Sequence, residues 1–244
     1  CMLASPRHEV VAVNASSPTS SAIRAVLFDL DGTLADTAPD LVAAVARLRQ
    51  RLGLPEMDLS HLPPLAGRGA VALMQAGIPE LDERERDAWR STYLDDYQAH
   101  CWEASRAFDG VEDLLDRLGA MGLKLGVVTN KIERLAMPVI EQAGWADRIG
   151  CVVAGDTSSR AKPAPDPILE ACRRLDVAAG DTVMVGDDER DVQAGRAAGC
   201  RTVAAAWGYL GRDADPRQWR ADLLVARPIE LLAGLAELQP GGAA

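Results

Sequence analysis

The 244-residue sequence predicts an α/β fold built on a parallel β-sheet. Short apolar runs without polar alternation recur along the chain, and such runs are typical of strands covered on both faces. Segments with apolar residues at helical spacing separate these runs. One long stretch breaks the alternation, because it contains several predicted helices and no strand-like run. The pattern therefore predicts a parallel sheet with crossover helices and an inserted helical block.

The predicted strands and helices alternate regularly outside that block. The strands are predicted at residues 25–30, 123–129, 149–154, 182–186, 202–206 and, more weakly, 222–226. The helices between them are predicted at residues 111–121, 134–143, 167–175 and 191–198. Gly122, Gly144 and Gly199 follow three of these helices, and glycine terminates helices well.

The inserted block covers residues 37–108, and we expect three helices in it, at 40–52, 68–76 and 82–102. In the last of these, Trp89, Tyr93, Tyr97 and Cys101 recur every fourth residue, so they form one stripe that either packs or contacts a substrate. A block inserted directly after the first strand would lie above the carboxyl edge of the sheet. It would then cover that edge as a movable cap.

Composition restricts the class of partner. The net charge is −10 and no run is rich in lysine or arginine, which argues against nucleic acid, since phosphate neutralisation needs basic patches. No apolar run approaches the ~18 residues of a membrane span. The acidity suits a site that holds a divalent cation.

The five cysteines are scattered, without a Cys-x-x-Cys pair, and the three histidines show no ligand spacing. We therefore expect neither a zinc site nor a disulfide framework, and a cytoplasmic location. Residues 1–22 have an apolar run too short for a signal peptide and are expected to form a loose extension. The oligomeric state is left open between monomer and homodimer.

The first predicted strand ends in Asp29-Leu30-Asp31-Gly32-Thr33. Side chains alternate along a strand, so the two carboxylates begin on the same side before Gly32 turns the chain. Two neighbouring carboxylates repel each other unless a cation or a shared task offsets their charge. The carboxyl edge of an open α/β sheet is where ligands bind. This pattern indicates chemistry at that edge.

Three further polar motifs follow later predicted strands. Thr129-Asn130 ends one apolar run, Lys162 lies in a proline-rich turn, and Gly186-Asp187-Asp188 ends another run, with Asp191 close behind. Taken singly, Thr129 could be a turn residue and Lys162 a solvated charge.

Taken together and in this order, the four motifs resemble those of the haloacid dehalogenase-like hydrolase superfamily. Its phosphatases carry Asp-x-Asp-Gly-Thr, then Thr or Ser, then Lys, then Gly-Asp with a further Asp four residues on. The resemblance covers about residues 23–232. It implies a Rossmann-like catalytic core, formed by residues 23–36 and 109–244, with residues 37–108 as an α-helical cap.

The resemblance also implies catalytic roles. Asp29 would be the nucleophile and form an aspartyl-phosphate, while Asp31 would act as general acid and then as base. Mg²⁺ would take oxygens from Asp29 and Asp187 and the backbone carbonyl of Asp31. Thr129 would bind a phosphoryl oxygen, and Lys162 would supply positive charge.

The remaining polar residues have less defined roles. Asn130 or a backbone amide would assist in binding the phosphoryl group, and Asp191 would orient Lys162 or hold a metal-bound water. Direct metal ligation by Asp191 or Asp188 stays open. Arg68, between Gly67 and Gly69, would either pair with a substrate carboxylate or lie in an ordinary turn.

The motifs around the site resemble two groups of phosphatases. Residues 31–41 and 191–199 are similar to phosphoglycolate phosphatases. Residues 108–111, 186–191, 208–209 and 215–219 are similar to the branch that contains N-acetylmuramic acid 6-phosphate phosphatases. We expect a Mg²⁺-dependent phosphatase acting on a small carboxylated phosphate monoester, with phosphoglycolate first and the amino-sugar phosphate as the alternative.

Three other functions are alternatives to a phosphatase: a dehalogenase, a hexose-phosphate mutase and a non-enzymatic binding protein. A dehalogenase needs neither metal nor a second acid, so Asp31 and Asp187 argue against it. A hexose-phosphate mutase shares the chemistry and stays open. A non-enzymatic binding protein would be expected to lack one of Asp29, Asp31, Lys162 or Asp187, and all four are present.

Overall fold

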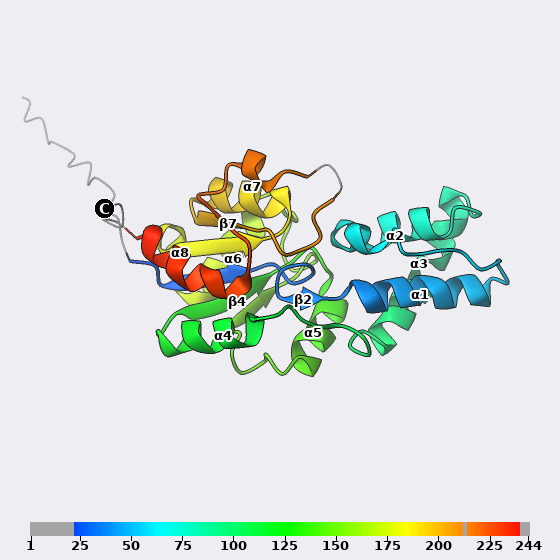
Figure 1. Ribbon diagram of the computed structural model, residues 1–244, viewed down its shortest axis with the longest axis horizontal. Helices are drawn as coiled ribbons and strands as arrows, with labels where there is room; N and C mark the ends of the chain where they lie inside the picture. Colours follow the sequence, from blue (N-terminus) through cyan, green and yellow to red (C-terminus); the bar gives the residue numbers. More distant parts are fainter. Residues whose placement is uncertain (1–21, 212–213, 240–244) are drawn as a thin grey trace, which may run out of the picture.

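A six-stranded sheet forms the centre of the computed structural model, which describes residues 22–211 and 214–239 (Figure 1). The strand order is β5-β4-β1-β6-β7-β8, and every neighbouring pair is parallel. The strands are β1 (Ala25–Phe28), β4 (Lys124–Val128), β5 (Cys151–Val153), β6 (Thr182–Gly186), β7 (Arg201–Ala205) and β8 (Leu223–Val225). The predicted α/β class with a parallel sheet is confirmed, and each predicted strand lies within about two residues of its observed position.

Helices cover both faces of the sheet, as the apolar composition of its strands requires. Val26 and Phe28 of β1 belong to the cluster that includes α4 (Val111–Ala120), α5 (Glu133–Gln142) and α8 (Leu231–Glu237). Ala25 and Leu27 belong to the opposite cluster, with α6 (Asp166–Leu175) and α7 (Glu189–Ala198). Alternate residues of one strand therefore pack into different layers. Three short 3₁₀ helices complete this part: η2 (Ala179–Asp181), η3 (Pro216–Trp219) and η4 (Pro228–Glu230).

Three helices lie to one side of the sheet and form a separate helical layer (Figure 1). They are α1 (Ala38–Arg51), α2 (Gly69–Gly77) and α3 (Glu83–Ala99), with the 3₁₀ helix η1 (Pro63–Arg68) before α2. Asp82 and Glu85 form a capping box that satisfies free amides at the start of α3. We call residues 38–99 the helical unit.

Two short strands connect the helical unit with the sheet. β2 (Ala35–Asp36) and β3 (Arg106–Ala107) pair in antiparallel fashion, where the chain leaves the sheet and where it returns. The buried carboxylate of Asp40 ties the start of α1 to this return, since it accepts hydrogen bonds from the amides of Ala104 and Ser105 at 2.9 and 2.8 Å. The expectation that residues 37–108 hold no strand is wrong at β3. A two-residue strand carries no periodic pattern, so pairing with β2 alone defines it.

The aromatic stripe of α3 packs inside the protein. Tyr93 and Tyr97 are fully buried and Cys101 is almost so. The tyrosine hydroxyl of Tyr93 donates to the carbonyl of Leu41 on α1 at 3.2 Å. The packing interpretation of the stripe therefore fits the structure better than substrate contact.

Two sequence expectations concern the ends of the chain and the membrane. The predicted extension at residues 1–22 lies outside the described residues, apart from Ala22. Among the helices that the structure describes, none is long and apolar enough to cross a membrane.

Candidate active site

The polar motifs meet beside β1, where the order in which the chain adds strands to the sheet changes from one side to the other. From β1 the chain passes to β4 and β5 on one side, and later to β6, β7 and β8 on the other. The carboxyl ends of strands at such a switch point form a crevice in which ligands bind. Asp29 directly follows β1, Thr129 follows β4, and Asp187 follows β6.

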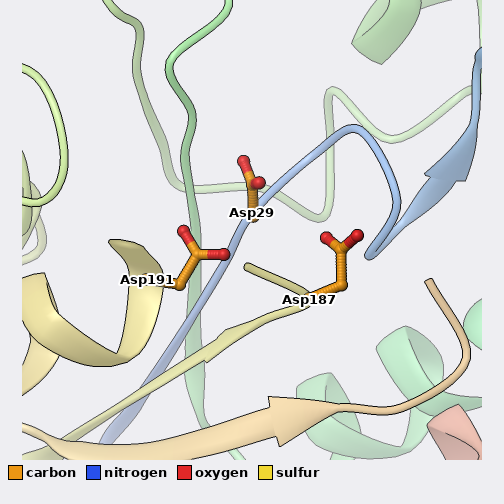
Figure 2. A group of neighbouring side chains, drawn as sticks. All are labelled: Asp29, Asp187 and Asp191. Carbon is orange, nitrogen blue, oxygen red and sulfur yellow. The ribbon is translucent and has the colours of Figure 1, made fainter. Parts of the chain in front are cut away.

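Three carboxylates converge in this crevice. One oxygen from each of Asp29, Asp187 and Asp191 lies within 4.8 Å of the others, and Figure 2 shows the three side chains as neighbours. Burial raises the pKa of Asp187, and the charges of Asp29 and Asp191 raise it further. Gly32 allows this approach, because a Cβ there would lie 2.1 Å from Oδ2 of Asp187. The three carboxylates are called the acidic cluster below.

Lys162 supplies the opposite charge beside the acidic cluster. Its Nζ lies 3.0 Å from Asp29, 2.6 Å from Asp191 and 2.6 Å from the carbonyl of Val128, and its side chain is 2% exposed. Burial opposes a positive charge, but Asp191 and Asp29 outweigh it, so the pKa of Lys162 is raised. The lysine is therefore a fixed cation beside the proposed nucleophile.

Asp191 belongs to the first turn of α7. Its Oδ2 accepts from the amide of Asp188, and Asp188 in turn caps the helix. Burial raises the pKa of Asp191 to about 7, although Lys162 opposes this shift. Of the two roles considered for Asp191, the orientation of Lys162 is the one with a direct contact.

Asp31 binds a lysine that the sequence analysis missed. Both oxygens of Asp31 accept from Nζ of Lys131, at 2.9 and 3.0 Å, and Oδ1 also accepts from the hydroxyl of Thr37. The Lys131 ammonium lies 4.5 Å from the ring centroid of Tyr97 on α3, a cation–π contact. The sequence held one signal for it: Lys131 directly follows the Thr129-Asn130 motif.

Thr129 and Asn130 differ in what their side chains do. The Thr129 hydroxyl accepts from the amide of Lys131 at 3.1 Å, at the edge of the crevice. The amide group of Asn130 bonds both to the carbonyl and to the N–H of Lys162, each at 3.0 Å. In this structure the Asn130 side chain holds the loop of Lys162 in place, and its expected role in phosphoryl binding stays a prediction. Sequence reasoning missed this contact because the partner lies 32 residues away.

A cavity of about 470 Å³ opens between the acidic cluster and the helical unit. Its lining includes Asp29, Asp31, Thr129 and Lys162 at the sheet edge, and Arg68 at the end of η1. The lining also contains the polar residues Arg90, Asn130, Lys131, Asp188, Arg190 and Asp191, and the apolar residues Leu41, Ala66, Ala70, Val71, Leu94, Ile132 and Leu135. The cavity therefore combines charged groups with apolar surface within one lining.

Arg190 connects this cavity wall with the helical unit. Its guanidinium binds both oxygens of Asp188, at 2.7 and 2.9 Å, and donates to the carbonyl of Gly67 at 2.7 Å. Burial raises the pKa of Asp188, but the bonds from Arg190 outweigh this and lower it. Because Asp188 already binds Arg190, it is a weaker candidate than Asp187 for a metal ligand.

The acidic cluster suits a hard divalent cation. All donors are carboxylate oxygens, which Mg²⁺ and similar ions prefer. The partners of Asp187, the Thr33 hydroxyl and the Tyr209 amide at 2.8 Å each, are neutral and leave its charge unpaired. A cation between these three side chains would offset the repulsion that raises the pKa of Asp187.

Comparisons with known proteins agree with this geometry. A family model described as haloacid dehalogenase-like hydrolase matches residues 26–205. A phosphoglycolate phosphatase from Xanthomonas campestris is 45% identical over 89% of this chain and 98% of its own. An N-acetylmuramic acid 6-phosphate phosphatase from Pseudomonas aeruginosa is 41% identical over 86% of this chain and 93% of its own.

Solved structures share the fold. The crystal structure of a predicted phosphoglycolate phosphatase from Haemophilus somnus superposes with a TM-score of 0.77 and 26% identity, over 86% of this chain and 97% of that one. The match extends across both the sheet and the helical unit. The chain therefore belongs to the haloacid dehalogenase-like hydrolases and, within them, to the phosphatases.

Proposed function

We propose that the protein is a Mg²⁺-dependent phosphatase that hydrolyses small carboxylated phosphate monoesters through an aspartyl-phosphate. The observation that carries the proposal is the position of Asp29. Its carboxylate faces the cavity, is 14% exposed and is held by the buried Lys162. It also contributes to the acidic cluster. A carboxylate so placed is accessible to a substrate and cannot rotate freely.

The proposed reaction has two halves. Asp29 attacks phosphorus, the bond between phosphorus and the ester oxygen breaks, and Asp31 gives that oxygen a proton. Asp31 then takes a proton from water, which attacks the phosphorus of the aspartyl-phosphate, and the products are inorganic phosphate and free Asp29. Thr129 would donate to a phosphoryl oxygen, and Lys162 would stabilise negative charge on the transferred group.

The metal would be held by Asp29 and Asp187, with the backbone carbonyl of Asp31 as a third donor. When bound, Mg²⁺ would reduce the repulsion between the Asp29 carboxylate and the phosphate dianion. The carboxylate of Asp31 itself faces Lys131 in this structure, so that residue would contribute its carbonyl alone.

The first substrate candidate is 2-phosphoglycolate, the ester for which the Xanthomonas relative is named. Arg68 lies in the cavity wall on the helical unit. A guanidinium there would pair with the carboxylate of a substrate whose phosphate lies at Asp29. This explains why a carboxylated ester would be preferred over a neutral one.

The cavity itself favours a second candidate, N-acetylmuramic acid 6-phosphate. Pockets for drug-sized ligands span roughly 300–1,000 Å³, and the 470 Å³ observed here fall in that range. A two-carbon ester would leave the apolar wall of Leu41, Val71 and Leu94 without contact, whereas a sugar ring with its lactyl and acetyl groups would cover it. Both candidates carry a carboxylate for Arg68.

We further propose that residues 37–108 act as a cap that closes over the substrate. The cavity lies between the helical unit and the sheet edge, so a movement of one against the other would open it. A cytoplasmic setting is also proposed, and it agrees with the free thiols of Cys101, Cys151, Cys172 and Cys200.

Phosphate release tests the proposal. We would compare kcat/KM for 2-phosphoglycolate and N-acetylmuramic acid 6-phosphate with Mg²⁺, and repeat both with EDTA. A preference for the amino-sugar ester by tenfold or more, roughly 1.4 kcal/mol, would assign the larger substrate. Activity that persists in EDTA would overturn the metal dependence, and transfer of phosphate to a second sugar hydroxyl would indicate a mutase.

A further inference from the structure

Tyr209 contacts both connections between the sheet and the helical unit. Its hydroxyl donates to Oδ1 of Asp36 on β2 at 2.9 Å and accepts from the amide of Ala38, the first residue of α1, at 2.8 Å. Its ring packs edge-on against Phe108, directly after β3, with centroids 6.1 Å apart. In Figure 1, β2 lies between the sheet and α1, at the narrow junction of the two parts.

The backbone of the same residue contacts the acidic cluster. The amide of Tyr209 donates to Oδ2 of Asp187 at 2.8 Å. Gly208 packs so closely that a Cβ there would lie 2.2 Å from the carbonyl oxygen of Gly32. The indole of Trp207 donates to the carbonyl of Thr33 at 2.9 Å. Residues 207–209 are therefore held against the loop that follows β1, so the backbone that carries the Tyr209 side chain is itself held in place.

The side chain is suited to hold the junction. Its hydroxyl both donates and accepts, so it bonds to β2 and to the start of α1 at the same time. Asp36 has a second partner, Arg106, at 3.3 Å, but that arginine side chain is 70% exposed. Exposed ion pairs contribute little to stability. The bond to Tyr209 is thus the stronger restraint on Asp36.

We propose that Tyr209 is a positioning residue that sets the angle of the helical unit over the acidic cluster and so determines how well the cavity wall meets the substrate. This inference rests on the proposed phosphatase function. Leu41, Arg68 and Leu94 belong to the helical unit, whereas Asp29 and Lys162 belong to the sheet edge. A looser junction would weaken contacts with the body of the substrate and leave phosphate binding in place.

The test uses Tyr209→Phe, which keeps the ring and the backbone amide and removes the hydroxyl. Tyr93→Phe is the matched control, because it removes a buried hydroxyl that bonds within the helical unit. We would measure hydrogen exchange of the Ala38 amide, and kcat/KM for N-acetylmuramic acid 6-phosphate and for p-nitrophenyl phosphate. A lost hydrogen bond corresponds to about a five- to tenfold effect.

We expect Tyr209→Phe to speed exchange at Ala38 by about five- to tenfold and to lower the preference for the sugar ester by a similar factor through KM. Tyr93→Phe should change neither quantity. Unchanged exchange at Ala38 would overturn the proposal, and so would an equal loss on both esters, since that would place the effect in the acidic cluster. The exchange measurement needs no turnover, so it still tests Tyr209 if neither ester is a substrate.

Discussion

Asp29 is the residue on which the proposed chemistry depends most directly. The Asp29→Asn variant keeps the size of the side chain, but an amide cannot form the acyl-phosphate. We expect kcat to fall by at least about 10³-fold with Mg²⁺ present, and no phosphorylated protein to form on incubation with substrate. Asp156→Asn, at an acid whose carboxylate caps α5 outside the cavity, serves as the control. Near-normal turnover in Asp29→Asn would show that another group is the nucleophile.

Lys131 is the residue that the structure adds to the site. Its ammonium holds both oxygens of Asp31, so Lys131→Gln would leave the proposed acid and base without its main anchor. A misplaced catalytic group costs up to about 10²-fold, and we expect kcat to fall by about 10- to 100-fold while KM changes little. Lys124→Gln, at a lysine that bonds to the carbonyl of Leu175, is the control. An unchanged kcat would show that Lys131 does not position Asp31 for catalysis and only packs against Tyr97.

At the residue scale, the sequence allowed prediction of the polar groups that follow strands. It did not allow prediction of the contacts that other segments make with these groups. Asp29, Lys162 and Asp187 could be placed because strand ends in a parallel sheet share one edge. In the sequence, Lys131 cannot be distinguished from a solvated charge. Only the folded chain shows its contact with the ring of Tyr97 on α3. The partner of Asn130 could not be predicted for a similar reason, since Lys162 lies in the loop between β5 and α6 and meets Asn130 only in the folded chain.

At the scale of elements, the loop of η1 and the start of α2 present Arg68 to the cavity. The bond from Arg190 to the carbonyl of Gly67 holds this loop to the sheet edge. Arg68→Ala would remove a contact that exists equally in the bound and the reacting substrate, so KM should rise by about tenfold with kcat nearly unchanged. Arg51→Ala, at the far end of α1, should leave both constants as they are. If KM did not change with either carboxylated ester, Arg68 would be a residue of an ordinary turn and not a substrate contact.

The elements themselves were predictable where glycine, proline or a change of period marks their ends. β6 was predicted residue for residue, and α6 and α7 to within about two residues at each end. β3 was not predictable, because its two residues acquire their structure only by pairing with β2. That short pair, together with Tyr209, joins the two parts of the molecule, so the least predictable element is also the one on which the proposed cap movement depends.

For the molecule as a whole, the acidic cluster concentrates buried charge at the junction of sheet and helical unit. Asp187 and Asp191 both have raised pKa values in the folded state, Asp191 to about 7. The unfolded carboxyls would ionise near the ordinary value of 3.8. The folded protein therefore binds more protons than the unfolded chain between these values. Protonation of these carboxyls therefore favours the folded state. This stabilisation is fully present below about pH 4 and is lost as the pH rises toward 7.

A bound divalent cation should reverse this loss, because it stabilises the ionised cluster in the folded state only. Its contribution is about 2.7 kcal/mol at 100 times its Kd. We would measure urea unfolding at pH 5.5 and 7.5, with EDTA or with Mg²⁺. In EDTA, the wild-type protein should lose stability between the two pH values relative to Asp187→Asn, which carries one charge less in the cluster. Mg²⁺ should stabilise the wild type most at pH 7.5 and the variant much less. Equal stabilisation of both proteins by Mg²⁺ would place the ion outside the acidic cluster.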